Sequence, residues 1–414
     1  MKQARNLDAT TKKRQPLPFE GLQVLDISQG AAGPYCAHML WQQGAQVTKV
    51  EPPAGDWSRG VGVLRDGISS LTIAMNGGKQ GLCVDASTPA GQQIVRSLAE
   101  RADVIVENFR PGVAARLGLD PKEWCERRPE LIFVSISGYG TGGPYAGAPA
   151  TDSVVQADAG LMFCNRGDDA TPRKIGVFLA DINAGLYSAQ AVGAALYRRR
   201  ATGRGEHIEI NLFDTCAATL ICNYAEHGLE PEREARPVTP LTAPNATFRT
   251  RDGAINLVTM NDEQFERLCD ALGRPGWKAD ERFQGMRNRV RNVSALNVLI
   301  AEVVKEEGTD HWSRRFTKND VLHAPVRSYS ECIDHPQAKH LNTFERIEQP
   351  GLGELSLPGS PVRSMRRGVQ PAPYIGQDSL TVLQQAGFSS EQIDRWIRDG
   401  VVVQHPRTLT SSKA

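Results

Sequence analysis

Residues 22–51 read LQVLDISQGAAGPYCAHMLWQQGAQVTKVE, and this stretch decides the fold. An apolar run of strand length, residues 22–27, leads to the turn Gly33-Pro34 and then to a helix-like segment that stops at Gly44. Proline suits the first turn of a helix, and glycine suits the position after its last turn. A second strand-like run, residues 45–51, follows directly. The stretch therefore predicts a strand, a helix and a second strand.

The same alternation continues as far as residue 212. Thr88 and Pro89 have the residue types of a helix cap and a first helical position, and residues 184–200 form a long helix-like run that ends at Thr202-Gly-Arg-Gly205. Strands that alternate with helices predict an α/β fold with a mostly parallel sheet covered on both faces. Ligands bind such sheets at the carboxyl ends of the strands. The other strand-like runs are residues 81–85, 104–108, 131–136 and 207–212.

Length and composition limit the possible functions. A chain of 414 residues favours two domains over one. Its 48 basic and 47 acidic residues leave a net charge of +1, so nucleic acid is not an expected partner. No apolar run is long enough for a membrane span, and none resembles a secretory signal. Eight scattered cysteines without a C-x-x-C pair favour the reducing cytoplasm, and the dispersed histidines predict no metal site.

The later part of the chain changes character. Residues 1–18 are expected to form a flexible leader, and the proline-rich residues 228–246 are expected to form a linker. Asp252-Gly253 is a hairpin turn signal between two short strand-like runs, and residues 262–325 look mostly helical. A smaller α+β domain is therefore expected after the linker.

Asp181 is the most informative single residue. It closes the run Lys174-Ile-Gly-Val-Phe-Leu-Ala-Asp181 and is followed by Ile-Asn-Ala-Gly185 at the start of the long helix. Such an acid either caps the helix or acts as a nucleophile, because a carboxylate among small residues is open to a large electrophile. The local sequence leaves both interpretations open.

Four other segments suggest a nucleotide-like ligand. Gly30-Ala-Ala-Gly-Pro-Tyr-Cys36 is a small-residue turn that lets a ligand approach the backbone, although a plain strand-to-helix turn looks the same. After the run that ends at residue 108, Phe109 could stack on an adenine, while Arg110 and Arg116 could pair with phosphates. The other two segments are Asp56-Trp-Ser-Arg59 and the glycine-rich Ser137-Gly-Tyr-Gly-Thr-Gly-Gly-Pro144.

Together these segments resemble the class III CoA-transferases, the family that includes formyl-CoA transferase and carnitine CoA-transferase. The resemblance is strongest over residues 19–215. It rests on the order and spacing of Gly21-Leu-Gln-Val-Leu-Asp, Ala32-Gly-Pro, Val50-Glu-Pro-Pro, Asn76-Gly-Gly-Lys79, Asp85-Ala-Ser-Thr-Pro-Ala-Gly91, Ala102-Asp-Val-Ile-Val-Glu-Asn-Phe-Arg-Pro-Gly112, Ser137-Gly-Tyr-Gly and Thr202-Gly-Arg-Gly205.

The resemblance implies a Rossmann-like large domain with a parallel sheet, a smaller α+β domain and an interlocked homodimer. The large CoA-binding domain would comprise residues 19–227, and residues 331–414 would supply a return linker and its C-terminal part. Residues 247–330 would form the small domain. The implied substrates are an acyl-CoA and a small carboxylic acid, with coenzyme A thioester as substrate and no permanently bound cofactor.

The resemblance also assigns roles to residues. Asp181 would be the catalytic aspartate, which needs no base because an ordinary aspartate is ionised at neutral pH. Apart from the resemblance, the residue types allow Asp152 to position the acceptor, tune Asp181 by like-charge repulsion or cap a helix. They allow Tyr139 and Trp57 to line the acyl pocket or belong to the core. Expected CoA contacts are Ala31, Ala32, Pro52, Val84, Asp85, Ala86, Ser87, Asn108, Phe109, Arg110, Arg116 and Pro149.

The chain departs from formyl-CoA transferase in two places, and three functions other than CoA transfer remain possible. Formyl-CoA transferase has a glutamine where this chain has Ala31, and its glycine-rich lid has no counterpart in residues 238–248. Racemases of 2-methylacyl-CoA share the fold, but they place a histidine where this chain has Thr151, and racemisation needs two proton-transfer groups. The other rivals are a non-catalytic CoA-binding subunit of a heteromer and a dehydrogenase, although the chain lacks a G-x-G-x-x-G fingerprint at its first turn.

Overall fold

The computed structural model describes residues 15–166, 170–232 and 241–406. Residues 1–14 of the expected leader and 233–240 of the expected linker lie outside this description. The described residues fall into two compact units. The first is drawn from residues 1–165, 172–222 and 342–414, and the second from residues 166–171 and 223–341.

The first unit is built on a seven-stranded sheet with the order β14-β5-β2-β1-β6-β7-β8. All neighbours are parallel except β14, which pairs antiparallel with β5. The six parallel strands, taken in chain order, follow the 3-2-1-4-5-6 order of a doubly wound Rossmann-like sheet, which confirms the predicted fold. The strands are β1 (Gln23–Asp26), β2 (Gln46–Glu51), β5 (Gln80–Val84), β6 (Val104–Glu107), β7 (Ile132–Ser137), β8 (Glu206–Asn211) and β14 (Val402–Val403).

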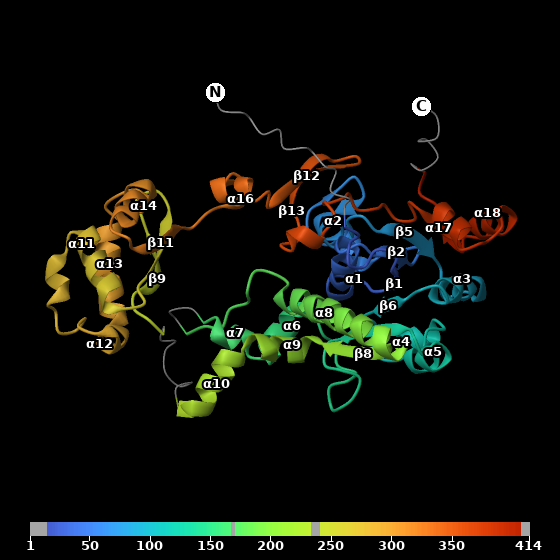
Figure 1. Cartoon of the computed structure of the whole chain (residues 1–414), viewed down its shortest axis with the longest axis horizontal. Coiled ribbons are helices and arrows are strands. Elements are labelled where there is room, and N and C mark those ends of the chain that lie inside the picture. Colours follow the sequence, from blue (N-terminus) through green and yellow to red (C-terminus); the bar gives the residue numbers. More distant parts are fainter. Residues whose placement is uncertain (1–14, 167–169, 233–240, 407–414) are drawn as a thin grey trace, which may run out of the picture. The chain divides into compact units, whose positions relative to one another are not determined.

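Alternate strand residues pack on opposite faces of this sheet, because side chains of a strand alternate in direction. Val24 belongs to a core with α1 (Ala32–Gln42) and α8 (Leu179–Thr202), whereas Leu25 belongs to a core with α3 (Pro89–Ala99), α5 (Pro121–Arg127), α17 (Ser379–Gln385) and α18 (Ser390–Arg398). Both faces are therefore covered, as predicted, and Figure 1 shows α8 running alongside α1.

Most boundaries in this unit match the sequence pattern, but α8 does not. The predicted helix over residues 184–200 begins five residues earlier, at Leu179, so Asp181 lies inside its first turn. Thr88 caps α3 as predicted, and Gly203 ends α8 in a left-handed conformation. The sequence did not indicate β3 (Leu64–Arg65), β4 (Ile68–Ser69), α2 (Ser70–Asn76), α4 (Val113–Arg116), α5, α6 (Asp152–Asp158), α7 (Leu161–Cys164), α9 (Leu212–Thr219), α10 (Ile221–Leu229) or α17.

The last part of the first unit adds a hairpin of β12 (Phe344–Gln349) and β13 (Gly353–Pro358). The second unit has an antiparallel sheet with the order β11 (Leu322–Pro325), β10 (Ala254–Val258) and β9 (Asn245–Arg249). The turn at Asp252-Gly253 joins β9 to β10 as predicted. Helices complete this unit, and its own apolar core includes Phe265, Leu296 and Trp312. They are α11 (Asp262–Leu272), α12 (Met286–Arg291), α13 (Val293–Val304), α14 (Thr309–Lys318), α15 (Tyr329–Ile333) and α16 (Pro336–His340).

Two further observations concern the helices and the cysteines. Among the helices of the described residues, none has both the length and the apolarity needed to cross a membrane. All eight cysteines are free thiols, and four of them are buried.

Candidate active site

A cavity of about 240 Å³ opens at the carboxyl ends of β1, β2, β5 and β6. This is the edge of the sheet where the strand order reverses and where doubly wound folds bind their ligands. Six of the predicted CoA contacts line it together, although they come from three separate segments of the chain. They are Pro52, Val84, Asp85, Ala86, Ser87 and Phe109.

The other predicted CoA contacts do not line this cavity. Asn108 lies next to it and exchanges two hydrogen bonds with the main chain of Gln29, a lining residue, at 2.6 and 2.7 Å. Arg110 and Arg116 are exposed beyond β6 and form no ion pair within the described part of the chain. Pro149 is exposed shortly before α6, and the structure does not bring it to the cavity.

Ala31 and Ala32 lie at the start of α1, where α8 comes very close. A methyl group on Gly185 would lie 2.8 Å from the carbonyl oxygen of Ala32, so only glycine permits this approach. Both helices precede strands of the parallel sheet, and both therefore begin at its carboxyl edge. Asp181 is one helical turn before Gly185 on the same face of α8. The structure thus brings Asp181 to the edge that holds Ala31, Ala32 and the cavity.

The Asp181 side chain is partly buried. Burial, together with the nearby Asp152 carboxylate, raises the pKa of Asp181 to about 7. The expectation of an ordinary, fully ionised aspartate is therefore wrong, because both effects disfavour the charged form. Among the described residues, none donates a hydrogen bond to the Asp181 carboxylate, so the structure gives it no capping role.

Asp152 supplies the cap of α8. Its Oδ1 accepts the backbone N–H of Ala180 at 2.8 Å and lies 3.4 Å from the backbone nitrogen of Asp181. Its Oδ2 accepts a hydrogen bond from Gln156 at 2.7 Å, and Gln156 also binds the main chain of Ile175 and Val177. Asp152 thus both caps α8 and acts electrostatically on Asp181, two of the three roles considered from the sequence.

Trp57 and Tyr139, predicted for the acyl pocket, lie in different places. Trp57 packs on the turn before α1, since a methyl group on Gly30 would lie 2.0 Å from its ring, and its side chain is 55% exposed. Tyr139 contacts Tyr145 and Phe213, and burial with a hydrogen bond to Asp158 raises its pKa. Asp158 ends α6, whereas Asp152, which acts on Asp181, begins it.

Sequence reasoning missed a buried charged cluster beneath the Gly30 turn. It consists of Asp26, Lys49, Asp56 and Lys79, all at most 4% exposed. One signal was available, because Lys49 lies in the middle of a strand in a sheet that was expected to be covered on both faces. A larger cavity of about 380 Å³ lies at the opposite, amino edge of β1, β2 and β5, and it contains none of the predicted residues. No group of three or more potential metal ligands occurs within the described ranges.

Comparison with known proteins assigns the family. The profile of CoA-transferase family III matches residues 19–379. The chain is 31% identical to a succinyl-CoA:glutarate CoA-transferase of Homo sapiens, across 94% of this chain and 90% of that protein. It is 32% identical to an acetyl-CoA:oxalate CoA-transferase of Acetobacter aceti, across 86% and 91%.

A solved structure agrees with this assignment. The crystal structure of a CAIB/BAIF family protein from Brucella suis superposes with a TM-score of 0.82 and 31% identity, and it covers 90% of this chain and 100% of that one. The chain therefore belongs to CoA-transferase family III. It is an acyl-CoA:carboxylate CoA-transferase, and CoA thioesters are its substrates.

Proposed function

We propose that this enzyme transfers CoA through covalent intermediates on Asp181. The carboxylate attacks the carbonyl carbon of the donor thioester, which breaks the C–S bond and gives a mixed anhydride and CoA thiolate. The thiolate then attacks the aspartyl carbonyl, forms an aspartyl-CoA thioester and releases the donor acid. The acceptor carboxylate attacks that thioester, expels the thiolate and forms a second mixed anhydride with Asp181. The thiolate then attacks the acceptor carbonyl of this anhydride, which forms the product and releases the Asp181 carboxylate.

The observation that carries this proposal is the close contact of Gly185 with Ala32. It sets the first turn of α8 beside the turn that the family resemblance assigns to CoA, on the edge of the sheet that holds the cavity. The partly exposed Asp181 carboxylate is free of hydrogen-bond donors from the described residues, so its oxygens are available for bond formation. Backbone N–H groups of Ala184 and Gly185, considered from the sequence for the developing oxyanions, lie inside α8 and bind the carbonyl oxygens four residues before them, so they are not assigned that role.

The proposed substrates are succinyl-CoA as donor and a small dicarboxylic acid as acceptor. Support comes from relatives, which are named for succinyl-CoA with glutarate or mesaconate and for acetyl-CoA with oxalate. Racemisation is disfavoured because Thr151, at the start of α6, cannot replace a proton-transferring histidine.

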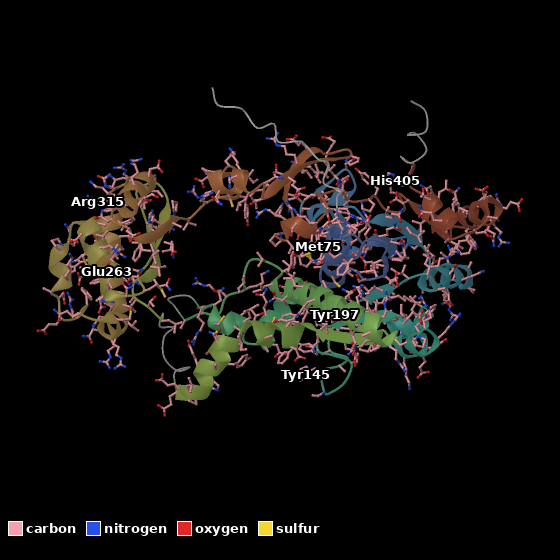
Figure 2. All side chains as sticks on the ribbon, in the orientation of Figure 1. Met75, Tyr145, Tyr197, Glu263, Arg315 and His405 are labelled. Carbon is pink, nitrogen blue, oxygen red and sulfur yellow. The ribbon has the colours of Figure 1, made fainter. Side chains whose placement is uncertain are left out.

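We further propose a homodimer of interlocked subunits. Large apolar side chains on α8 and α10 are exposed on the single chain, and burial of such a surface favours association. Tyr197, on α8 and marked in Figure 2, is 80% exposed, and Leu229 on α10 is 89% exposed. Light scattering at several concentrations tests this, and a monomer throughout would contradict it.

Asp181→Ala tests the mechanism. The variant should bind CoA with the wild-type affinity in calorimetry but should transfer no CoA from succinyl-CoA to glutarate. Incubation of the wild-type enzyme with succinyl-CoA and hydroxylamine should convert Asp181 to a hydroxamate, which peptide mass spectrometry locates. Transfer by the alanine variant, or an unmodified Asp181 peptide after treatment, would refute the covalent route.

A further inference from the structure

The turn between β1 and α1 is held by side chains rather than by regular secondary structure. Three consecutive backbone N–H groups each find a side-chain acceptor: Ser28 on Asp26 at 3.0 Å, Gln29 on Asn108 at 2.7 Å and Gly30 on Asp56 at 2.9 Å. A second contact joins Gly30 to the other Asp56 oxygen at 3.1 Å. The path of the turn is therefore set residue by residue before Ala31 and Ala32 are reached.

Two buried lysines complete this scaffold. Lys49 pairs with Asp56 at 3.0 Å and donates a hydrogen bond to the carbonyl oxygen of Ser28. Lys79 donates to Asp26 and to the carbonyl oxygen of Pro34, in each case at 2.8 Å. A buried charge is costly unless it is paired and hydrogen-bonded, so a cluster of two cations and two anions around one turn strongly restricts its geometry.

Asp56 is itself held in place by Glu51, which in turn is bound by Arg59. Its backbone N–H donates to Glu51 Oε2 at 2.8 Å, and Arg59 binds both oxygens of Glu51 at 2.6 and 2.7 Å. The next residue, Trp57, lays its ring against Gly30, which has a left-handed φ of 79°. Gly30 is thus held by hydrogen bonds to the Asp56 carboxylate and by packing against the Trp57 ring.

We propose that Asp56 is a positioning residue for coenzyme A. Its carboxylate fixes Gly30 so that the Ala31–Ala32 backbone presents the bound CoA arm to Asp181, across the close contact between α1 and α8. This inference rests on the proposed role of Asp181, because the geometry matters only if chemistry occurs there. Asp56 touches no substrate and acts through the turn.

Two substitutions at Asp56 test the proposal. Asp56→Asn keeps one acceptor for the Gly30 N–H but places an amide against the Lys49 ammonium, and Asp56→Ala removes both contacts. Asp252→Ala is the control, since Asp252 likewise accepts a backbone N–H, from Thr309 at 2.8 Å, but lies in the second unit, whereas the predicted site residues all lie in the first.

The measurements are the Kd for CoA by calorimetry, the kcat and KM for succinyl-CoA, and the Tm. We expect Asp56→Ala to raise Kd and KM about tenfold or more, which corresponds to about 1.4 kcal/mol. Asp56→Asn should give a smaller rise, and Asp252→Ala should lower only the Tm. Wild-type Kd and KM in both Asp56 variants would overturn the proposal.

Arg59→Gln covers the case in which the Asp56 variants do not fold. It removes the ion-pair partner of Glu51, which is itself buried, and leaves the four ions of the cluster in place. A raised Kd is expected, and an unchanged Kd would overturn the proposal. The Kd is measured without turnover, so it does not depend on Asp181 chemistry. Failure of the covalent mechanism would instead appear as transfer by Asp181→Ala with normal CoA binding.

Discussion

The carboxylate of Asp152 accepts the backbone N–H of Ala180 at 2.8 Å, so one acid caps the helix that carries the other. A negative charge is favourable at the start of α8, because the helix dipole is positive there. That same charge disfavours ionisation of Asp181 one residue later, and burial adds to the effect. Structural support for the helix therefore determines how easily the proposed nucleophile loses its proton.

The pH dependence of the reaction follows from this arrangement. An aspartate ordinarily ionises near pH 3.8, but the raised pKa of Asp181, about 7, keeps its carboxyl largely protonated below neutrality. Only the carboxylate attacks, so kcat/KM for succinyl-CoA should rise from pH 5.5 to pH 8 with a midpoint near pH 7 in the free enzyme. Stopped assays over this range measure it, and a flat profile would contradict the assignment.

Asp152→Asn should move that midpoint to lower pH, because it removes one of the two causes of the shift while burial remains. The variant should also be less stable by about 1–3 kcal/mol, since the asparagine NH₂ would face the Gln156 NH₂ that now donates to Asp152. Asp158→Asn, at the other end of α6, is the matched control and should leave the midpoint unchanged. Equal midpoints in all three proteins would remove Asp152 from this role.

Stability should respond to the same carboxyl group. A carboxyl whose pKa is raised in the folded state stabilises the fold at low pH and loses that contribution as the pH rises from the ordinary value towards about 7. Asp181→Asn has no such dependence. Its Tm relative to wild type should therefore increase between pH 4 and pH 8, as measured by calorimetry in matched buffers. A constant difference in Tm would show that Asp181 ionises normally in the folded chain.

The sequence correctly predicted the helix ends that are fixed by residues close by in the chain. Thr88 and Pro89 define the start of α3, and Gly203 defines the end of α8, because caps act within a few residues. The start of α8 was placed too late because its cap, Asp152, is 28 residues from Ala180 along the chain. Contacts of this separation leave no local pattern.

The same limit applies to the candidate site. Six residues that the resemblance named for CoA line one cavity, since the carboxyl ends of parallel strands meet at that edge. It attached no role to Asp26 or Lys79, although both lie in the matched motifs, because their partners become neighbours only in the folded sheet. Repulsion by Asp152 was considered from the sequence, but the burial that contributes most to the raised pKa of Asp181 was missed, since burial is a property of the fold.

Alanine substitutions at two glycines of α8 test whether the contact between α8 and α1 determines the position of Asp181. Gly185→Ala would place a methyl group 2.8 Å from the Ala32 carbonyl oxygen and 3.0 Å from the Tyr35 ring, so the helices must separate. We expect a loss of about 1–3 kcal/mol in stability from this overpacking. Because the displacement also moves Asp181 away from the CoA turn, kcat should fall as well.

Gly193→Ala is the matched control two turns further along α8. Its new methyl group would meet nothing closer than 3.9 Å, so the variant should gain about 1 kcal/mol from better helix propensity and keep full activity. Urea unfolding gives the free energies, and steady-state assays with succinyl-CoA and glutarate give kcat. The assigned geometry requires the two alanines to act in opposite directions on stability, with only Gly185→Ala slowing transfer. Equal activity in both variants would mean that the α1–α8 spacing does not position Asp181.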